Sequence, residues 1–123
     1  MVGSWCPYTD EDSEKWIQAD FGGEYLVQKF ATKPRDFSDG FVRYLTAYKF
    51  ALSGNGNDFE MIRISNGDEK VFTGNSGTDD PGVEHVINAT LARYARLYTL
   101  AWEEGPCVRW EVYACIAGGL PTF

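Results

Sequence analysis

The chain has 123 residues, enough for one domain, and its 11 basic and 18 acidic side chains give a formal net charge of −7. This acidic balance argues against a nucleic-acid binder, which needs a basic face, and against docking onto anionic lipid. Hydrophobic residues make up 44% of the chain, so a packed core is expected, but no apolar run reaches the roughly 20 residues of a membrane span.

The sequence has the pattern of short strands separated by turns. Apolar and polar residues alternate in 16–21, and Gly22-Gly23 is expected to turn the chain into the next strand. The aromatic-rich segment 44–53 ends near Asn55-Gly56, a dipeptide typical of tight hairpins, and Asn66-Gly67 predicts another turn. The expected strands are 16–21, 25–30, 44–53, 59–64, 70–72, 85–91, 94–100 and 108–113.

About eight short strands with turns between them predict an antiparallel β-sandwich that presents loops at its two ends. No segment keeps an apolar stripe of helical period, so long helices are not expected. Residues 75–82 are rich in Gly, Asp and Pro and are predicted to form a loop, while 117–121 is typical of a linker that leaves the domain.

No catalytic constellation is visible, because the sequence lacks GxSxG, HExxH and P-loop motifs. The doublets Asp79-Asp80 and Glu103-Glu104 are interpreted as solvated charge, since glycoside hydrolysis needs two carboxyls that face each other. The acidic run at 10–14 is interpreted as a solvated turn, with a Ca²⁺ site as the weaker alternative. His85, the single histidine, is expected to be a packed or surface residue. We therefore predict a protein that is not an enzyme and has no cofactor.

The three cysteines, Cys6, Cys107 and Cys115, form no CxxC pair, and their odd number leaves at least one without a partner in the chain. A zinc site would need all three to converge with His85, so no metal site is predicted. The residues alone leave two alternatives open. The cysteines are either buried free thiols, or Cys6 forms a long-range disulfide with a C-terminal cysteine, which requires an oxidising compartment.

Six segments, in order, resemble the discoidin domain, also called the coagulation factor V/VIII type C domain. Residues 3–7 (GSWCP) resemble its GxWCP motif, and residues 16–22 (WIQADFG) resemble WLQVDLG. Residues 48–59 are similar to the YxxxYSxDGxxW hairpin, with Phe59 where Trp is usual. The remaining matches are 72–75 with FxGN, 92–97 with ARYIRL and 107–115 with CLRVELYGC.

The resemblance implies an all-β fold, an antiparallel jelly-roll β-sandwich of the galactose-binding-like type, over residues 1–116, with 117–123 as a tail. It also implies a disulfide between Cys6 and Cys107. Roughly the first thirty residues of the usual domain have no counterpart here, including the cysteine that would pair with Cys115. Cys115 is therefore expected to be unpaired or interchain, and either this thiol or an exposed edge strand would allow a dimer.

No signal peptide is visible in the chain, which the same shortening would explain, and the resemblance implies an extracellular or cell-surface location. In that setting the sequon Asn88-Ala89-Thr90 predicts glycosylation at Asn88. Trp5, Trp16 and Trp110 are expected in the core. Arg93, Arg96 and Arg109, which lie in segments shared with the family, are expected in structural ion pairs rather than at a ligand.

Members of the family bind cell-surface glycans, phosphatidylserine membranes or collagen. Arg35 matches a loop arginine of the collagen-binding members, but Arg43 stands where those members have an acidic residue. Phe37 either meets the ligand or pins its own loop, and Trp102 either stacks on a ligand or packs against the Cys6–Cys107 disulfide. The predicted ligand-binding residues are Arg35, Asp36, Phe37, Asp39, Trp102 and Glu103.

We therefore predict a non-catalytic, extracellular recognition or adhesion module that binds a cell-surface glycan or a protein ligand through loops at one end of the sandwich. A phosphatidylserine-binding or membrane-surface domain is the first alternative, although the net charge of −7 counts against it. A cytosolic jelly-roll interaction domain with reduced thiols is the second. A requirement for Ca²⁺ stays open, and nucleic acid is excluded as a partner.

Overall fold

The computed structural model describes residues 16–33, 44–76, 82–103 and 108–115. Within these ranges all helices and strands assigned are β-strands. No helix among these residues is long and apolar enough to cross a membrane. The strands are β1 (Trp16–Lys33), β2 (Tyr44–Ser53), β3 (Glu60–Met61), β4 (Phe72–Thr73), β5 (Val83–Glu103) and β6 (Arg109–Cys115).

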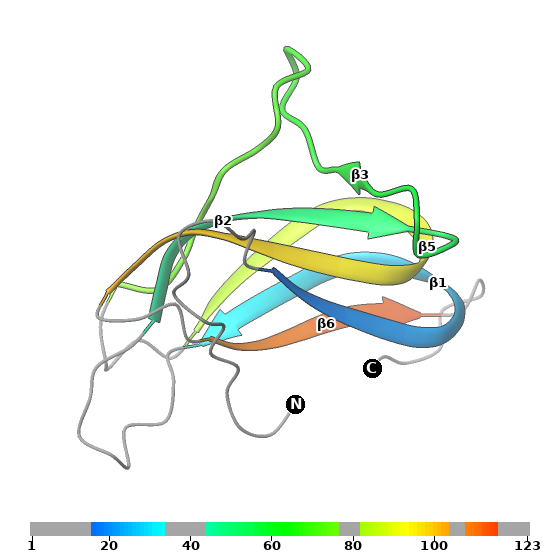
Figure 1. The fold of residues 1–123 in the computed structure, drawn as a ribbon, viewed down its shortest axis with the longest axis horizontal. Coiled ribbons are helices and arrows are strands. Elements are labelled where there is room, and N and C mark those ends of the chain that lie inside the picture. The colour runs from blue at the N-terminus through cyan, green and yellow to red at the C-terminus, as the bar shows by residue number, and fades with distance from the viewer. Residues whose placement is uncertain (1–15, 34–43, 77–81, 104–107, 116–123) are drawn as a thin grey trace.

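The six strands form one antiparallel sheet that folds back on itself into two layers (Figure 1). The strand order is β3-β2-β5-β1-β6, and β4 pairs with β2 beside β3. The first layer holds β2, β3, β4, residues 94–103 of β5 and residues 16–20 of β1. The second layer holds residues 25–33 of β1, residues 83–92 of β5, and β6. The antiparallel β-sandwich predicted from the sequence is confirmed.

The long strands β1 and β5 each pass from one layer to the other, and this corrects the predicted number of strands. β1 joins the segments predicted as 16–21 and 25–30, and β5 joins 85–91 and 94–100. The pairing of β1 with β5 shifts between Asp20 and Tyr25, where the chain bends. Gly22 has a φ of +81°, which a glycine adopts without strain. The expected turn at Gly22 is therefore a bend within one strand, and we call this part of the molecule the corner end.

The connection from β2 to β4 is mostly irregular. The strand predicted at 59–64 shortens to β3. The one predicted at 70–72 becomes β4, which begins two residues later and ends one residue later. A tight turn lies between them, where the backbone amide of Gly67 donates to the carbonyl of Ile64 at 2.9 Å. This confirms the turn predicted at Asn66-Gly67. Lys49 of β2 holds this connection through an ion pair with Glu69 at 2.8 Å.

Aromatic rings from both layers fill the space between them. Phe30 of the second layer stacks on Phe50 of the first, with ring centroids 4.0 Å apart, and meets the edge of Phe72 at 5.1 Å. Trp110 of β6 packs edge-on against Phe50 and is buried, as its sequence context predicted. Offset and edge-to-face aromatic pairs add to the stabilisation from buried area alone, so these rings fix the spacing of the two layers.

Candidate ligand-binding site

Several strand ends meet at one end of the sandwich, which we call the loop end. Tyr44 at the start of β2 pairs with Glu103 at the end of β5, and Lys33 at the end of β1 pairs with Arg109 at the start of β6. Both ends of β5 lie here, opposite the corner end (Figure 1). Binding residues are disproportionately found on loops that a rigid scaffold positions. The segments that join these strand ends, all outside the described residues, are 34–43, 77–81 and 104–107.

A buried hydrogen-bond network lies beneath the loop end. Thr32 Oγ1 and Tyr48 Oη are 2.7 Å apart, and both side chains are fully buried. Tyr48 Oη is also 3.1 Å from His85 Nε2, which lies 2.9 Å from the carbonyl oxygen of Thr73. The side-chain amide of Asn75 donates to the carbonyl of Thr32 at 3.1 Å. Because buried polar groups are costly unless bonded, this network fixes the strand ends from which the loops depart.

His85 is a packed residue of this network. Its ring centroid lies 4.9 Å from that of Phe72 and 5.2 Å from that of Phe30. Burial lowers the pKa of His85 below its ordinary 6.5, the bond to the Thr73 carbonyl opposes this, and Lys70 lowers the pKa further. The ring is therefore neutral at pH 7, and its bond to a carbonyl requires that Nε2 carries the proton. His85 is thus a packed residue, one of the two roles that the sequence predicted for it.

Gly74 brings the chain close against β2 just before the loop end. Its amide donates to the carbonyl of Thr46 at 2.8 Å, and the amide of Asn75 donates to that of Leu45 at 2.8 Å. A Cβ atom on Gly74 would overlap the carbonyl oxygen of Leu45 and press against the ring of Tyr48. Only glycine fits this approach, which in turn lets the buried Asn75 reach Thr32.

Two of the predicted ligand-binding residues lie among the described residues, and both are at the loop end. Trp102 is 38% exposed and lies opposite Leu45 in the register of β5 with β2. Glu103, the last residue of β5, is also exposed. An indole with this much surface at the loop end can stack on a planar or apolar ligand face.

Trp16 is 37% exposed, so the prediction that it belongs to the core is wrong. Its ring is covered on one side by the guanidinium of Arg96, 3.9 Å from the ring centroid. The same guanidinium lies 3.9 Å from the ring of Phe59 and donates to Gln18 Oε1 at 2.8 Å. Arg96 therefore has a structural role through stacking between two aromatic rings, and the expected ion pair is not found among the described residues.

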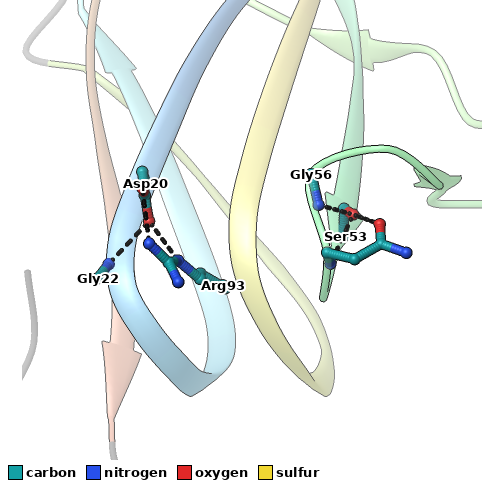
Figure 2. Close-up of polar contacts among 6 residues, drawn as sticks. Asp20, Gly22, Ser53, Gly56 and Arg93 are labelled. Atoms are coloured by element: carbon teal, nitrogen blue, oxygen red, sulfur yellow. Dashed lines mark hydrogen bonds and ion pairs between the residues drawn. The ribbon is translucent and has the colours of Figure 1, made fainter.

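Asp20 and Arg93 join two of the segments that carry the family resemblance, at the corner end (Figure 2). Arg93 Nε and Nη2 donate to Asp20 Oδ1 and Oδ2 at 2.8 Å and 3.2 Å. The backbone amide of Gly22 donates to Asp20 Oδ1 at 2.9 Å. The bond from Arg93, followed by that from Gly22, holds the pKa of Asp20 below 3.8. Arg93 thus forms the structural ion pair that the sequence predicted.

Cys115 and Asn88 are described, and both lie away from the loop end. Cys115 is a buried free thiol that accepts a hydrogen bond from Gln28 Nε2 at 3.0 Å. Asn88 is exposed on β5. The other predicted site residues lie outside the described residues: Cys6, Arg35, Asp36, Phe37, Asp39 and Cys107.

The described part of the loop end offers a surface rather than a deep pocket. A pocket of about 40 Å³ between Lys33, Arg109 and Trp110 has room for little more than one water molecule. Among the described residues, no group of three or more His, Cys, Asp or Glu side chains could hold a metal ion. A larger groove, of about 350 Å³, lies toward the corner end, between the chain after β2 and residues 88–91.

A two-layer antiparallel sandwich whose strand ends meet at one end, beside a buried polar network, is an architecture suited to a binding module. The chain belongs to the F5/8 type C domain family, whose model matches residues 2–112. The match spans nearly the whole chain and confirms the resemblance seen in the sequence.

The chain is similar to part of several larger proteins. It is 34% identical to neuropilin-1a of Danio rerio over 113 residues, which are 90% of this chain and 12% of that protein. It is 32% identical to lactadherin of Rattus norvegicus over 117 residues, which are 94% of this chain and 27% of that protein. The chain thus spans between an eighth and about a quarter of the length of these relatives.

Solved structures show the same fold. Discoidin II of Dictyostelium discoideum superposes with a TM-score of 0.74 at 19% identity, over 93% of this chain and 42% of that one. A Clostridium perfringens module, CpGH89CBM32-5, solved in complex with GalNAc-β-1,3-galactose, gives 0.66 at 24% identity, over 93% of this chain and 75% of that one. These likenesses confirm the jelly-roll β-sandwich predicted from the sequence.

The buried network beneath the loop end was missed by the sequence reasoning. Thr32, Tyr48 and His85 lie 16 and 37 residues apart along the chain, and no local pattern predicts such contacts. A sequence signal did exist for Gly74-Asn75, since this pair ends the FxGN-like segment. The structure shows what that segment does, which is to seat one loop base against β2.

Proposed function

We propose that the chain is a non-catalytic, extracellular recognition module that binds a glycan or a protein ligand at the loop end. The observation that carries this proposal is the exposed Trp102, which lies at the loop end beside a buried hydrogen-bond network. A rigid base beneath an exposed aromatic surface reduces the conformational cost of binding. Membership of the F5/8 type C family supports a binding role rather than a catalytic one.

The proposed site combines Trp102 and Glu103 with four residues of the 34–43 segment. An indole face binds the C–H face of a sugar or an apolar side chain. Carboxylates accept hydrogen bonds from hydroxyl groups, and arginine donates several in a fixed geometry. The complex of the C. perfringens module with GalNAc-β-1,3-galactose supports a glycan as the first candidate. The four residues of the segment are Arg35, Asp36, Phe37 and Asp39.

A membrane surface is the second candidate, and charge argues against it. Phosphatidylserine membranes attract lysine and arginine, whereas this chain has a net charge of −7. Binding that depends on attraction to anionic lipid would weaken sharply as salt increases. Binding through a hydrophobic loop residue that inserts into the lipid would instead depend little on salt.

The proposal is tested by one panel on the secreted chain. The panel contains immobilised GalNAc-β-1,3-galactose and other cell-surface glycans, fibrillar collagen, and phosphatidylserine vesicles at two salt concentrations. We expect saturable binding to a glycan or to collagen, and weaker binding after Arg35→Ala. Binding to vesicles alone would move the function to a membrane surface. Failure to bind any probe would contradict the proposed function.

The cytosolic alternative is separated by the redox state of the cysteines. The test is peptide mapping under non-reducing conditions on protein from a secretory host. It is expected to find a disulfide between Cys6 and Cys107. Three free thiols in a folded protein would favour a cytosolic interaction domain instead.

A further inference from the structure

A groove of about 350 Å³ lies away from the loop end, and the proposed ligand site does not use it. One wall is the chain that follows β2, including Met61 of β3. The other wall is formed by Asn88, Thr90 and Leu91 of β5. The volume falls within the range of small-molecule and sugar pockets. The groove therefore has room for a group that the described residues do not supply.

β5 bulges where it forms this wall. Thr90 pairs with Val27, and Val86 pairs with Lys29. The chain therefore advances four residues along β5 where it advances only two along β1. Ile87 is buried, but residues 88–91 are all exposed, which breaks the alternation of a regular strand. A bulge re-aims side chains in this way. Here it presents both Asn88 and Thr90 to the groove.

Asn88 and Thr90 are the defining residues of an N-glycosylation sequon. We propose that Asn88 carries an N-linked glycan and that the first sugar of this glycan lies in the groove. The inference rests on the proposed extracellular function, because the transfer takes place in the secretory pathway. In the transfer, Asn88 Nδ2 bonds to C1 of a polyprenyl-diphosphate-linked oligosaccharide. The C1–O bond breaks, the lipid diphosphate leaves, and the amide loses one proton.

The groove has the mixed chemistry that a sugar needs. Leu91 is 53% exposed and Met61 is half-buried, so they offer an apolar surface to the C–H face of the ring and to an acetamide methyl group. Asp58 and Glu60 line the same groove and can accept hydrogen bonds from the hydroxyl groups. Apolar lining with a few convergent polar groups is the usual composition of a ligand site.

A glycan at this position would also cover an open strand edge. Residues 83–91 of β5 pair with β1 on one side, and no other described strand pairs with them. Val86 on this edge is 78% exposed. Exposed edges with apolar side chains promote pairing between copies, and natural proteins protect them. A glycan anchored at Asn88, two residues along the same edge, would supply such protection.

Occupancy is tested first, on the full chain secreted from cells that attach high-mannose glycans. Peptide mass spectrometry is expected to find the glycan at Asn88 in the wild type and in Thr90→Ser, which keeps the sequon. Thr90→Val and Asn88→Gln are expected to lose it. A secreted, folded wild type with bare Asn88 would overturn the proposal.

The position of the first sugar is tested by the oxidation of Met61 in hydroxyl-radical footprinting. Three forms of the wild type are compared, with the intact glycan, with a single-sugar stub after endoglycosidase H, and with no sugar after amidase treatment. We expect Met61 to oxidise several-fold more slowly with the glycan or the stub than without sugar. Trp102, at the other end, serves as the control and should react equally in all three. Equal Met61 rates would show that the sugar points into solvent and would overturn the seating in the groove.

These results are independent of ligand binding. A protein that binds nothing at the loop end but carries a seated glycan would contradict the proposed function and leave this inference intact. A protein that binds through Trp102 with a bare Asn88 would do the reverse.

Discussion

Arg93 holds the carboxylate of Asp20 through two hydrogen bonds that span 73 residues of sequence. The pair lies where β1 and β5 pass from one layer to the other, beside the bend at Gly22 (Figure 2). It therefore joins the two corners that turn a single sheet into a sandwich. Both side chains remain partly exposed, so the geometry of the pair matters more than the strength of the charge attraction.

Replacement of Asp20 by Asn should lower the midpoint of thermal unfolding, because the neutral amide cannot hold both arms of the Arg93 guanidinium as a carboxylate does. Glu84→Gln is the matched control, since it removes a single ion pair, with Lys29 at 3.5 Å, and Glu84 is exposed. Circular dichroism melts at pH 7 compare the two. We expect a modest decrease in the midpoint of thermal unfolding for both variants, and the larger decrease for Asp20→Asn. Equal midpoints for the two variants would contradict a special role for the corner pair.

The Asp20 variant should also change the stability at acid pH. The pKa of Asp20 is lower in the folded chain than its ordinary 3.8, so the folded state favours the carboxylate. This stabilisation is present above pH 3.8 and is lost as the pH falls through the folded pKa. Melts recorded between pH 5 and pH 2 should therefore converge for the wild type and Asp20→Asn. Curves that stay parallel would show that the pair does not couple to protonation.

The sequence predicted the strands better than it predicted their contacts. Segment 44–53 was placed correctly because its aromatic alternation and the Asn-Gly turn act locally. The bends at Gly22 and in β5 were interpreted as strand breaks, because local turn residues do not show that pairing continues through a corner. Trp16 was assigned to the core from its residue type. Its exposure depends on which side of the first layer it faces, and that depends on distant partners such as Arg96.

Gly74→Ala should destabilise the fold and disturb the loop end. The new methyl group would overlap the Leu45 carbonyl, whose position is fixed by its bond to the Asn75 amide. We expect a loss of about 3 kcal/mol in the free energy of unfolding, at the upper end for single substitutions. Gly23→Ala is the matched control, because a Cβ there meets its nearest atom at an ordinary 3.7 Å. Urea unfolding measures both, and a Gly74→Ala protein as stable as Gly23→Ala would contradict the close approach.

Phe50→Ala tests the stacked aromatic core. Phe50 is fully buried and stacks on Phe30 across the two layers, so the substitution leaves a cavity between them. The expected loss is about 3–5 kcal/mol of unfolding free energy. Val86→Ala, at a largely exposed position, should change the stability by less than about 0.5 kcal/mol. Comparable losses at the two positions would contradict the assignment of the core.

His85 should make the stability fall in mildly acid solution. Its pKa in the folded chain lies below the ordinary 6.5, so the unfolded chain binds a proton more readily. Stability is therefore complete above pH 6.5 and declines as the pH falls from there toward the folded pKa. His85→Gln removes this titration while its amide can still donate to the Thr73 carbonyl. Urea unfolding between pH 7.5 and pH 5 should show a decline that is steeper in the wild type. A decline in His85→Gln that is equal or steeper would contradict the half-buried neutral ring.

The central claim, that the ligand binds at the loop end, is tested most directly by comparing Trp102→Ala with Trp16→Ala on the same panel of GalNAc-β-1,3-galactose, cell-surface glycans and collagen. The two indoles have nearly equal exposure, 38% and 37%, but Trp16 stacks on Arg96 away from the loop end. Removal of a tryptophan at a binding surface costs on the order of 2 kcal/mol, more than tenfold in affinity. The account predicts that loss for Trp102→Ala and wild-type affinity for Trp16→Ala. Wild-type affinity in Trp102→Ala together with weakened binding in Trp16→Ala would place the ligand elsewhere on the sandwich and contradict the account.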